Sequence, residues 1–352
     1  MIDIAQHRLY NQGLAQTRFE KPGNAVEWFG AVQAQDYPGA LWALGLRLPD
    51  ATEADIEQAL ADGVFVRTHP MRGTWHFVAA ADIRWLLSVT APHNIARSAT
   101  WYRRLELDDA TCVKSNELIA QALQGGKQLT RREIAGVLEN GGISTQGLRL
   151  TFLLHRAELD GVVVSGKRRG KQHTFARLDE VVPATKTLER DEALAELAHR
   201  YFTSHGPATI QDFIWWSSLS AADARSALEL ARPDLIQEVI QGRTYWLALS
   251  QPCAKVASPT VHLLPSYDEY TVAYKDRSAV LDPDNVQQTS YGLLPTIVVA
   301  GRIVGTWKRE IKKDEVIITL STFIPLTGAQ KAAVVAAAER YSRFVGKRLV
   351  IT

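Results

Sequence analysis

Cysteine is scarce in this sequence, and the motifs that most often hold metals are missing. The 352 residues include only two cysteines, Cys112 and Cys253, which lie far apart. So few thiols exclude a disulfide-stabilised secreted scaffold and favour a reducing compartment, which predicts a cytoplasmic protein. The chain has no H-E-x-x-H motif, no C-x-x-C pair and no histidine cluster. We therefore expect no metal site.

Nucleotide-binding and membrane signals are missing as well. The chain has neither G-x-x-x-x-G-K-[ST] nor G-x-G-x-x-G, and no G-x-S-x-G nucleophile elbow. These absences predict that the protein uses no cofactor. No apolar run approaches the length of a membrane span, and polar residues interrupt residues 2–14, where a signal peptide would lie. We expect no membrane contact.

Charge is balanced overall but concentrated locally. Forty Lys and Arg face 38 Asp and Glu, for a net charge of +2, and 46% of residues are hydrophobic. This composition is typical of a globular protein and excludes the strong positive field of a histone-like binder. Residues 161–178, however, contain no acidic residue and carry a dense group of cations: Lys167, Arg168, Arg169, Lys171 and Arg177. Any contact with a phosphate backbone is therefore expected at a local patch.

A unit of helices followed by a β-hairpin recurs three times along the chain. Apolar periodicity and capping residues predict helices at 4–14, 24–32 and 52–61, then at 116–123, 130–139 and 145–160, then at 191–204, 209–216 and 221–231. Capping boxes are expected where Thr52 precedes Asp55 and Thr130 precedes Glu133, and Asn24 is the expected N-cap of the second helix. The hairpins that follow are predicted at 64–78, 161–178 and 236–249, and another helix at 82–89 leaves the first unit. This is the pattern of a winged helix, in which Arg149 would lie on the recognition helix of the second unit.

The segment after the third unit has mostly strand patterns in place of helical ones. Strands are predicted at 261–264, 296–299, 302–306 and 316–323, before one amphipathic helix at 328–345. We therefore predict an α+β fold that is mostly α, with three tandem winged-helix units and a C-terminal β-rich domain closed by a terminal helix. The expected domains are residues 1–90, 91–180, 181–250 and 251–352.

Two glutamines follow the second predicted helix, in the sequence Gln33-Ala34-Gln35, before an Asp-Tyr-Pro-Gly segment that breaks the pattern. If this piece is extended, both carboxamides point to one side, whereas in a helix they diverge by about 200°. An amide is a poor base but can orient a water molecule. The alternative is that both are surface or capping residues.

The segment from Arg67 to His76 also includes His69, and it is dense in polar side chains. Strand alternation places Arg72, Thr74 and His76 on one face, which predicts either a solvated face or a cleft wall beside the glutamines. Asp268 and Glu269 could act as a base or stabilise a cation, or they could be structural. Lys308 follows a predicted hairpin. Its side chain is expected either to be solvated at a plain turn or to contact a phosphate.

Four segments together resemble a known bacterial family. They are VQAQDYPGA (32–40), RTHPMRGTWHFV (67–78), LPSYDEYTVAYKDR (264–277) and VVAGRIVGTWKR (298–309). In this order they resemble the winged-helix DNA-binding family of AlkZ-like, YcaQ-related interstrand-crosslink DNA glycosylases. The resemblance implies tandem winged helices, a C-terminal β-domain and a concave face that accommodates DNA.

The family's signature of glutamine, an apolar residue, then glutamine or aspartate falls on Gln33, Ala34 and Gln35. The resemblance therefore implies a monofunctional glycosylase that releases N7-alkylated purines, including bulky adducts and crosslinks, with Gln33 and Gln35 positioning the water. The glutamine–glutamine branch is associated with self-resistance to alkylating natural products. The expected partner is double-stranded, preferably alkylated DNA, bound by a monomer through the following residues: Arg67, His69, Arg72, Thr74, His76, Arg149, Lys167, Arg168, Arg169, Lys171 and Lys308.

Two other functions remain open from the sequence alone. A non-enzymatic winged-helix protein, such as a transcription regulator, would bind unmodified DNA sequence-specifically, usually as a dimer with paired half-sites. A protein-interaction module would bind DNA negligibly even at low salt, whereas a DNA-binding hairpin gives a strong salt dependence.

Overall fold

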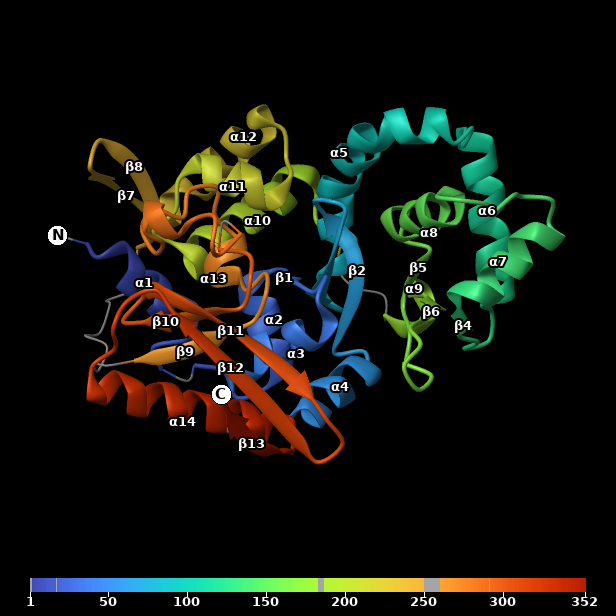
Figure 1. The fold of residues 1–352 in the computed structure, drawn as a ribbon. Helices are drawn as coiled ribbons and strands as arrows, with labels where there is room; N and C mark the ends of the chain where they lie inside the picture. Colours follow the sequence, from blue (N-terminus) through green and yellow to red (C-terminus); the bar gives the residue numbers. More distant parts are fainter. Residues whose placement is uncertain (1, 17, 183–186, 250–259, 291) are drawn as a thin grey trace.

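The computed structural model describes residues 2–16, 18–182, 187–249, 260–290 and 292–352 (Figure 1). Helices and strands are mixed along the whole chain. The boundary expected between residues 250 and 251 lies outside the described residues, as does Cys253. Within the described part of the chain, no helix is both long and apolar enough to cross a membrane.

The first unit places a short strand between its helices. Its elements are α1 (Ile4–Asn11), α2 (Pro22–Phe29), β1 (Val32–Gln33), α3 (Tyr37–Gly45), α4 (Glu53–Ala61), β2 (Phe65–Met71) and β3 (Thr74–Ala79). The three strands form one antiparallel sheet in the order β1-β3-β2. The capping box predicted at Thr52 and Asp55 is present and begins α4.

Two expectations for this unit were wrong. The Asp-Tyr-Pro-Gly segment does not break the helical pattern but begins α3, with Pro38 in its first turn. Proline is tolerated there because the first backbone N–H groups of a helix have no partner inside the helix. Asn24 lies inside α2, and Lys21 precedes that helix without a side-chain cap.

The second unit begins with a long helix and repeats the same order of elements. It comprises α5 (Ile83–Arg104), α6 (Asp109–Ala122), β4 (Leu129–Thr130), α7 (Arg131–Asn140), α8 (Arg149–Leu159), β5 (Val163–Ser165), β6 (Thr174–Arg177) and α9 (Leu178–Val181). Its strands are ordered β4-β6-β5. The capping box of Thr130 and Glu133 is confirmed at the start of α7. In Figure 1 this unit lies at the far end of α5, to one side of the other elements.

The third unit packs beside the first. It contains α10 (Arg190–His205), α11 (Ile210–Ser217), α12 (Ala221–Ala231), a 3₁₀ turn at Arg232–Asp234, β7 (Leu235–Ile240) and β8 (Arg243–Ala248). A single β-bridge joins Ala208, which precedes α11, to Trp246 on β8. Each of the three units thus pairs a short extended segment with the last strand of its hairpin.

The C-terminal segment forms a five-stranded sheet. Its elements are β9 (Val261–Leu264), α13 (Glu269–Val272), a 3₁₀ turn at Pro283–Asn285, β10 (Thr296–Val299), β11 (Arg302–Ile311), β12 (Glu315–Thr322), α14 (Gly328–Phe344) and β13 (Arg348–Ile351). The strand order is β13-β12-β11-β10-β9, and β13 pairs parallel with β12. The sequence did not predict β13, which is short and half-exposed.

The sequence suggested that this sheet forms a domain of its own. In the structure it shares a hydrophobic core with the first unit. Trp42 of α3 packs against Tyr341 and Phe344 of α14, with ring centroids 5.0 Å apart in both pairs. The second unit has a core of its own, built around Ile119, Ile134 and Leu153. The molecule therefore consists of a large body and a smaller unit joined to it by α5.

Candidate functional site

Gln33 and Gln35 lie where β1 gives way to a bend before α3. Gln33 pairs with His76 of β3, and the backbone N–H of Ala34 donates to the carbonyl oxygen of Trp75 at 2.7 Å. The segment is therefore extended at Gln33, the first of the two conformations considered from the sequence. The two glutamines nevertheless differ in environment, because Gln33 is 5% exposed whereas Gln35 is exposed to solvent.

The buried glutamine holds the exposed one in place. Gln33 Oε1 accepts a hydrogen bond from the backbone N–H of Gln35 at 2.8 Å. Gln35 Oε1 in turn accepts from the backbone N–H of Trp75 at 3.2 Å. A carboxamide oxygen has two lone pairs, so Gln35 retains an acceptor position for a water molecule or another donor.

A buried carboxylate from the C-terminal segment fixes the backbone of Gln33. Glu269 accepts a hydrogen bond from the backbone N–H of Gln33 at 2.7 Å and from Trp216 Nε1 at 3.1 Å, and His205 Nε2 lies 3.2 Å away. The adjacent Asp268 forms a buried, two-pronged ion pair with Arg47. Both acids are 1% exposed, so of the two roles considered for them the structure supports the structural one.

Two adjoining cavities open at the junction of the first and second units, and Gln35 lines both of them. The aromatic cavity, of about 450 Å³, is bounded by Trp75, Trp101, Phe152 and Phe175. The arginine cavity, of about 980 Å³, is bounded by Arg67, Arg131, Arg132 and Arg169. Trp75, Arg131 and Phe175 line both, so the two hollows are halves of one depression.

Arg67 and His69 border this depression from β2. Arg67 is 5% exposed, donates to the carbonyl oxygen of Ala34 and lies 4.1 Å from the ring centroid of Trp75. Burial lowers the pKa of Arg67 to about 10, which leaves it charged at neutral pH. His69 faces the aromatic cavity, lies tilted against Trp75 with ring centroids 3.8 Å apart, and pairs with Glu158 of α8. Both residues therefore lie beside Gln35.

Arg72, Thr74 and His76 do not line the cleft predicted for them. They share one side of the hairpin, as the alternation predicted, but none lines either cavity. Arg72 Nη1 donates to the carbonyl oxygen of Trp216, and Nη2 lies 2.9 Å from His76 Nε2. His76 is fully buried, and burial lowers its pKa well below the usual value. Arg72 thus contacts α11 of the third unit, and the DNA-binding role expected of these three residues stays a prediction.

The basic hairpin projects between the two units. Lys167 and Lys171 are exposed. Arg168 pairs with Glu57 of α4 at 2.8 Å, and Arg169 pairs with Glu133 of α7 at 2.8 Å. The hairpin thus reaches the first unit opposite the connection made by α5.

The remaining two predicted DNA contacts lie outside the depression. Arg149 lines neither cavity, is half-buried and donates to the carbonyl oxygens of Ser144 and Leu105. Lys308 is exposed on β11 and also lines neither cavity. Neither residue is brought beside Gln35.

Several residues that line the depression were missed from the sequence. Arg131 and Arg132 begin α7, where a helix dipole disfavours cations unless an anion is nearby, and this was a usable signal. Trp101, His155 and Glu158 gave no such signal, because helical periodicity places them among ordinary core positions. They face Gln35 only because α5 and α8 pack together.

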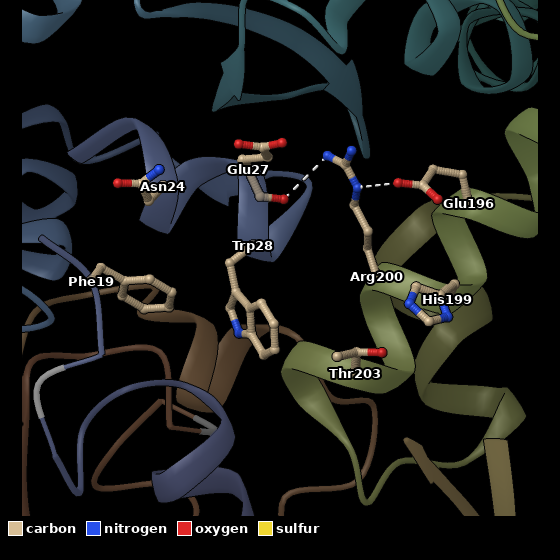
Figure 2. A pocket seen from close by; sticks show the side chains of 8 residues that line it. All are labelled: Phe19, Asn24, Glu27, Trp28, Glu196, His199, Arg200 and Thr203. Carbon is tan, nitrogen blue, oxygen red and sulfur yellow. Dashed lines mark hydrogen bonds and ion pairs between the residues drawn. The ribbon is translucent and has the colours of Figure 1, made fainter. Parts of the chain in front are cut away.

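A separate pocket of about 390 Å³ lies between α2 and α10 (Figure 2). Figure 2 shows Arg200 directed toward Glu27 and Glu196, donating to the backbone oxygen of the first and the carboxylate of the second. None of the predicted site residues lines this pocket. Among the described residues, no three His, Cys, Asp or Glu side chains are gathered as metal ligands would be.

Comparisons with known proteins extend over nearly the whole chain. Residues 26–344 match the family described as DNA glycosylase AlkZ-like. A Streptomyces sahachiroi protein named interstrand DNA cross-link repair glycosylase is 28% identical over 368 residues, covering 96% of this chain and 95% of the relative. The solved structure of Streptomyces sahachiroi DNA glycosylase AlkZ gives a TM-score of 0.83 at 24% identity, covering 99% of this chain and 98% of that one. The structural likeness shows a shared fold.

Proposed function

Because this chain belongs to the AlkZ-like DNA glycosylase family, we propose that it hydrolyses the N-glycosidic bond of N7-alkylated purines in double-stranded DNA. Bulky adducts and interstrand crosslinks are included, in line with the name of the Streptomyces relative. The observation that carries this proposal is the exposed carboxamide of Gln35 in a depression bordered by four arginines. The family membership favours this enzyme over the regulator and over the protein-interaction module.

The reaction needs little acid–base assistance. Alkylation at N7 gives the purine a positive charge, so the base leaves with the electron pair of the C1′–N9 bond and becomes neutral. A water oxygen forms the new bond to C1′, and its proton passes to solvent. Gln35 holds that water through its free lone pair and orients it toward C1′. Each tenfold gain in rate requires only about 1.4 kcal/mol of transition-state stabilisation.

The two glutamines take different parts in this scheme. Gln35 is exposed and contacts the water. Gln33 is buried and acts through Gln35, because its side-chain oxygen holds the Gln35 backbone N–H. The guanidinium of Arg67 donates two hydrogen bonds to the carbonyl oxygen of Ala34 and so fixes the residue between the two glutamines. Arg67 also adds positive charge beside the DNA backbone.

The arginine cavity and the basic hairpin are the proposed DNA contacts. Exposed Arg131 and Arg132, with Lys167 and Lys171 of the hairpin, can reach phosphates without a change in the core. The three repeated units are proposed to be winged helices, on the support of their common strand order and of the bridge at Ala208. The protein is proposed to act as a monomer.

The proposal is tested by measuring release of 7-methylguanine from alkylated duplex DNA. We expect wild-type protein to release the base and Gln35→Ala to lose at least about 100-fold in rate while retaining DNA affinity, since water orientation is lost. Gln33→Ala should lose less, because the Gln35 carboxamide remains. Gln58→Ala, on the exposed face of α4, provides the control. Equal rates for wild type and Gln35→Ala would refute the catalytic assignment.

A further inference from the structure

Glu158 is a buried carboxylate in the wall of the aromatic cavity, and it takes no part in the proposed hydrolysis. It is 1% exposed, and one of its oxygens pairs with His69 Nδ1. Its Oε1 has no hydrogen-bond partner among the described residues, and the same is true of His155 Nε2 nearby. Leaving such groups unpaired in a protein interior is costly. Their presence in a cavity wall therefore indicates a ligand that brings hydrogen-bond donors.

The walls around Glu158 suit a flat ligand. The rings of Trp101 and Phe152 are stacked, with centroids 5.8 Å apart and planes 25° apart. Trp101 is 43% exposed, which is unusual for so large an apolar side chain inside a depression. Exposed aromatic side chains of this kind stack on nucleic acid bases, and this stacking does not depend on the nucleotide sequence.

Cationic side chains predominate in the arginine half of the depression, which Glu133 also lines, paired with Arg169. The aromatic half is faced by Glu158 and by two imidazoles, His69 and His155, and burial lowers the pKa of His155 to about 4 so that it is neutral at pH 7. Arg131, on the border with the arginine half, donates to Thr151 Oγ1. Gln35 lies on the same border. A nucleotide with its phosphates on the arginines and its base among the aromatic rings would place its sugar at Gln35.

We propose that, for lesions confined to one strand, the aromatic cavity binds the N7-alkylated guanine base itself, turned out of the duplex and stacked on Trp101, with its N1–H and N2–H₂ edge donating to Glu158. This inference rests on the function proposed above and names the form in which the lesion is held. Enzymes that act on a base extrude it from the stack, and stacking on Trp101 would offset part of the free energy that this extrusion costs. Glu158 selects guanine, because the corresponding edge of adenine presents a ring nitrogen acceptor that a carboxylate repels.

The test uses duplex DNA treated with dimethyl sulfate, which carries both 7-methylguanine and 3-methyladenine. Release of the two bases is measured in one reaction with wild type, Glu158→Gln, Trp101→Ala and the control Trp215→Ala. Trp215 is 42% exposed, matching Trp101, but it lies on α11 and lines neither cavity. We expect Trp101→Ala to slow 7-methylguanine release about tenfold. Glu158→Gln should lower the ratio of 7-methylguanine to 3-methyladenine at least about fivefold. Trp215→Ala should stay within about twofold of wild type.

A binding measurement separates this inference from the proposed enzyme activity. Ligand-observed NMR with the nucleoside 7-methylguanosine needs no catalysis, and we expect saturation transfer to its base protons that Trp101→Ala abolishes and Trp215→Ala preserves. If the wild type releases no base but binds 7-methylguanosine through Trp101, the proposed function fails and the cavity assignment stands. A second outcome would overturn the cavity assignment and leave the proposed function intact. In that outcome the wild type releases 7-methylguanine, Trp101→Ala and Glu158→Gln release it as fast as Trp215→Ala, and 7-methylguanosine does not bind. Because Trp101 is an exposed residue near a helix end, its variant tests the inference even if Glu158→Gln fails to fold.

Discussion

Glu269 is the residue through which the C-terminal segment reaches the glutamines. It accepts hydrogen bonds from the Gln33 backbone and from Trp216 Nε1, and it contacts His205. Glu269→Gln replaces one acceptor oxygen by an NH₂ group that faces donors. We expect it to lower the free energy of unfolding by about 2–4 kcal/mol and to slow base release, because the Gln33 strand loses its anchor.

Urea unfolding and base release measured on the same preparation check this prediction. Glu196→Gln is a suitable control, since the Glu196 carboxylate pairs with Arg200 but is 36% exposed. That variant should change stability by less than about 1 kcal/mol. A Glu269→Gln protein with wild-type stability and rate would contradict the anchoring role.

His262 makes stability depend on pH. It is buried on β9, and burial, with nearby Arg340 and Arg47, lowers its pKa to about 4. The pKa of this histidine is lower in the folded state than in the unfolded chain. As pH falls, the unfolded chain therefore binds the proton at a higher pH than the folded protein does. The free energy of unfolding should therefore decrease between pH 6.5 and about 4, with His262 contributing about 2 kcal/mol of that decrease between pH 7 and 5.

Urea unfolding at pH 7 and pH 5 measures this loss, and His262→Gln removes the titrating group. We expect the difference between the two pH values to shrink by about 2 kcal/mol in the variant. His199→Gln, which changes a histidine whose side chain is 41% exposed on α10, should leave the difference close to that of the wild type. An unchanged pH dependence in His262→Gln would show that His262 does not titrate in this range.

At the scale of elements, the basic hairpin is held in place by pairs that compete with DNA. Arg168 pairs with Glu57, and Tyr37 Oη also donates to Glu57 at 3.2 Å. Both partners of the ion pair are about one-third exposed, so the pair contributes less than about 1 kcal/mol. Glu57→Gln should free Arg168 for a phosphate and raise DNA affinity. The slope of log affinity against log salt should steepen from about −2.7 to about −3.6, as a fourth phosphate contact forms.

Fluorescence anisotropy with unmodified duplex DNA over a range of KCl concentrations measures these slopes. Lys167→Ala is the matched opposite variant, and it should make the slope shallower by about 0.9. Weaker DNA binding by Glu57→Gln would mean that the pair serves to position the hairpin for DNA rather than to neutralise it.

Local sequence signals predicted most elements because their causes are local. Thr52, Thr130 and Thr209 each begin a helix with an acidic partner three residues later, and all three capping boxes are present. The start of α3 was missed because Pro38 suits a turn as well as the first turn of a helix. Strand β13 was missed because its pairing with β12 depends on the folded sheet.

The site was less predictable, since its contacts join distant parts of the chain. Alternation correctly grouped Arg72 with His76 but could not say which face of the hairpin α11 would cover. The link between Gln33 and Glu269 spans 236 positions. Glu158 looks like an ordinary charge on a helix, and its burial is evident only once α8 packs beside β2.

At the scale of the whole molecule, three features join the large body to the second unit: α5, the packing of α8 and β5 against β2, and the Arg168–Glu57 pair. The depression with Gln35 lies between them. Pro92 lies inside α5 and removes a backbone donor from its middle, which is where a helix bends most readily. Any bend of α5 is therefore limited by the packing of α8 and β5 against β2.

The dependence of Gln33 on Glu269 has a consequence for biosynthesis. The ribosome completes the repeated units before it makes the carboxylate that anchors their reactive strand. A polypeptide released before residue 269 would lack the acceptor of the Gln33 backbone N–H. If the proposed function holds, unfinished copies are expected to bind DNA without leaving abasic sites in it.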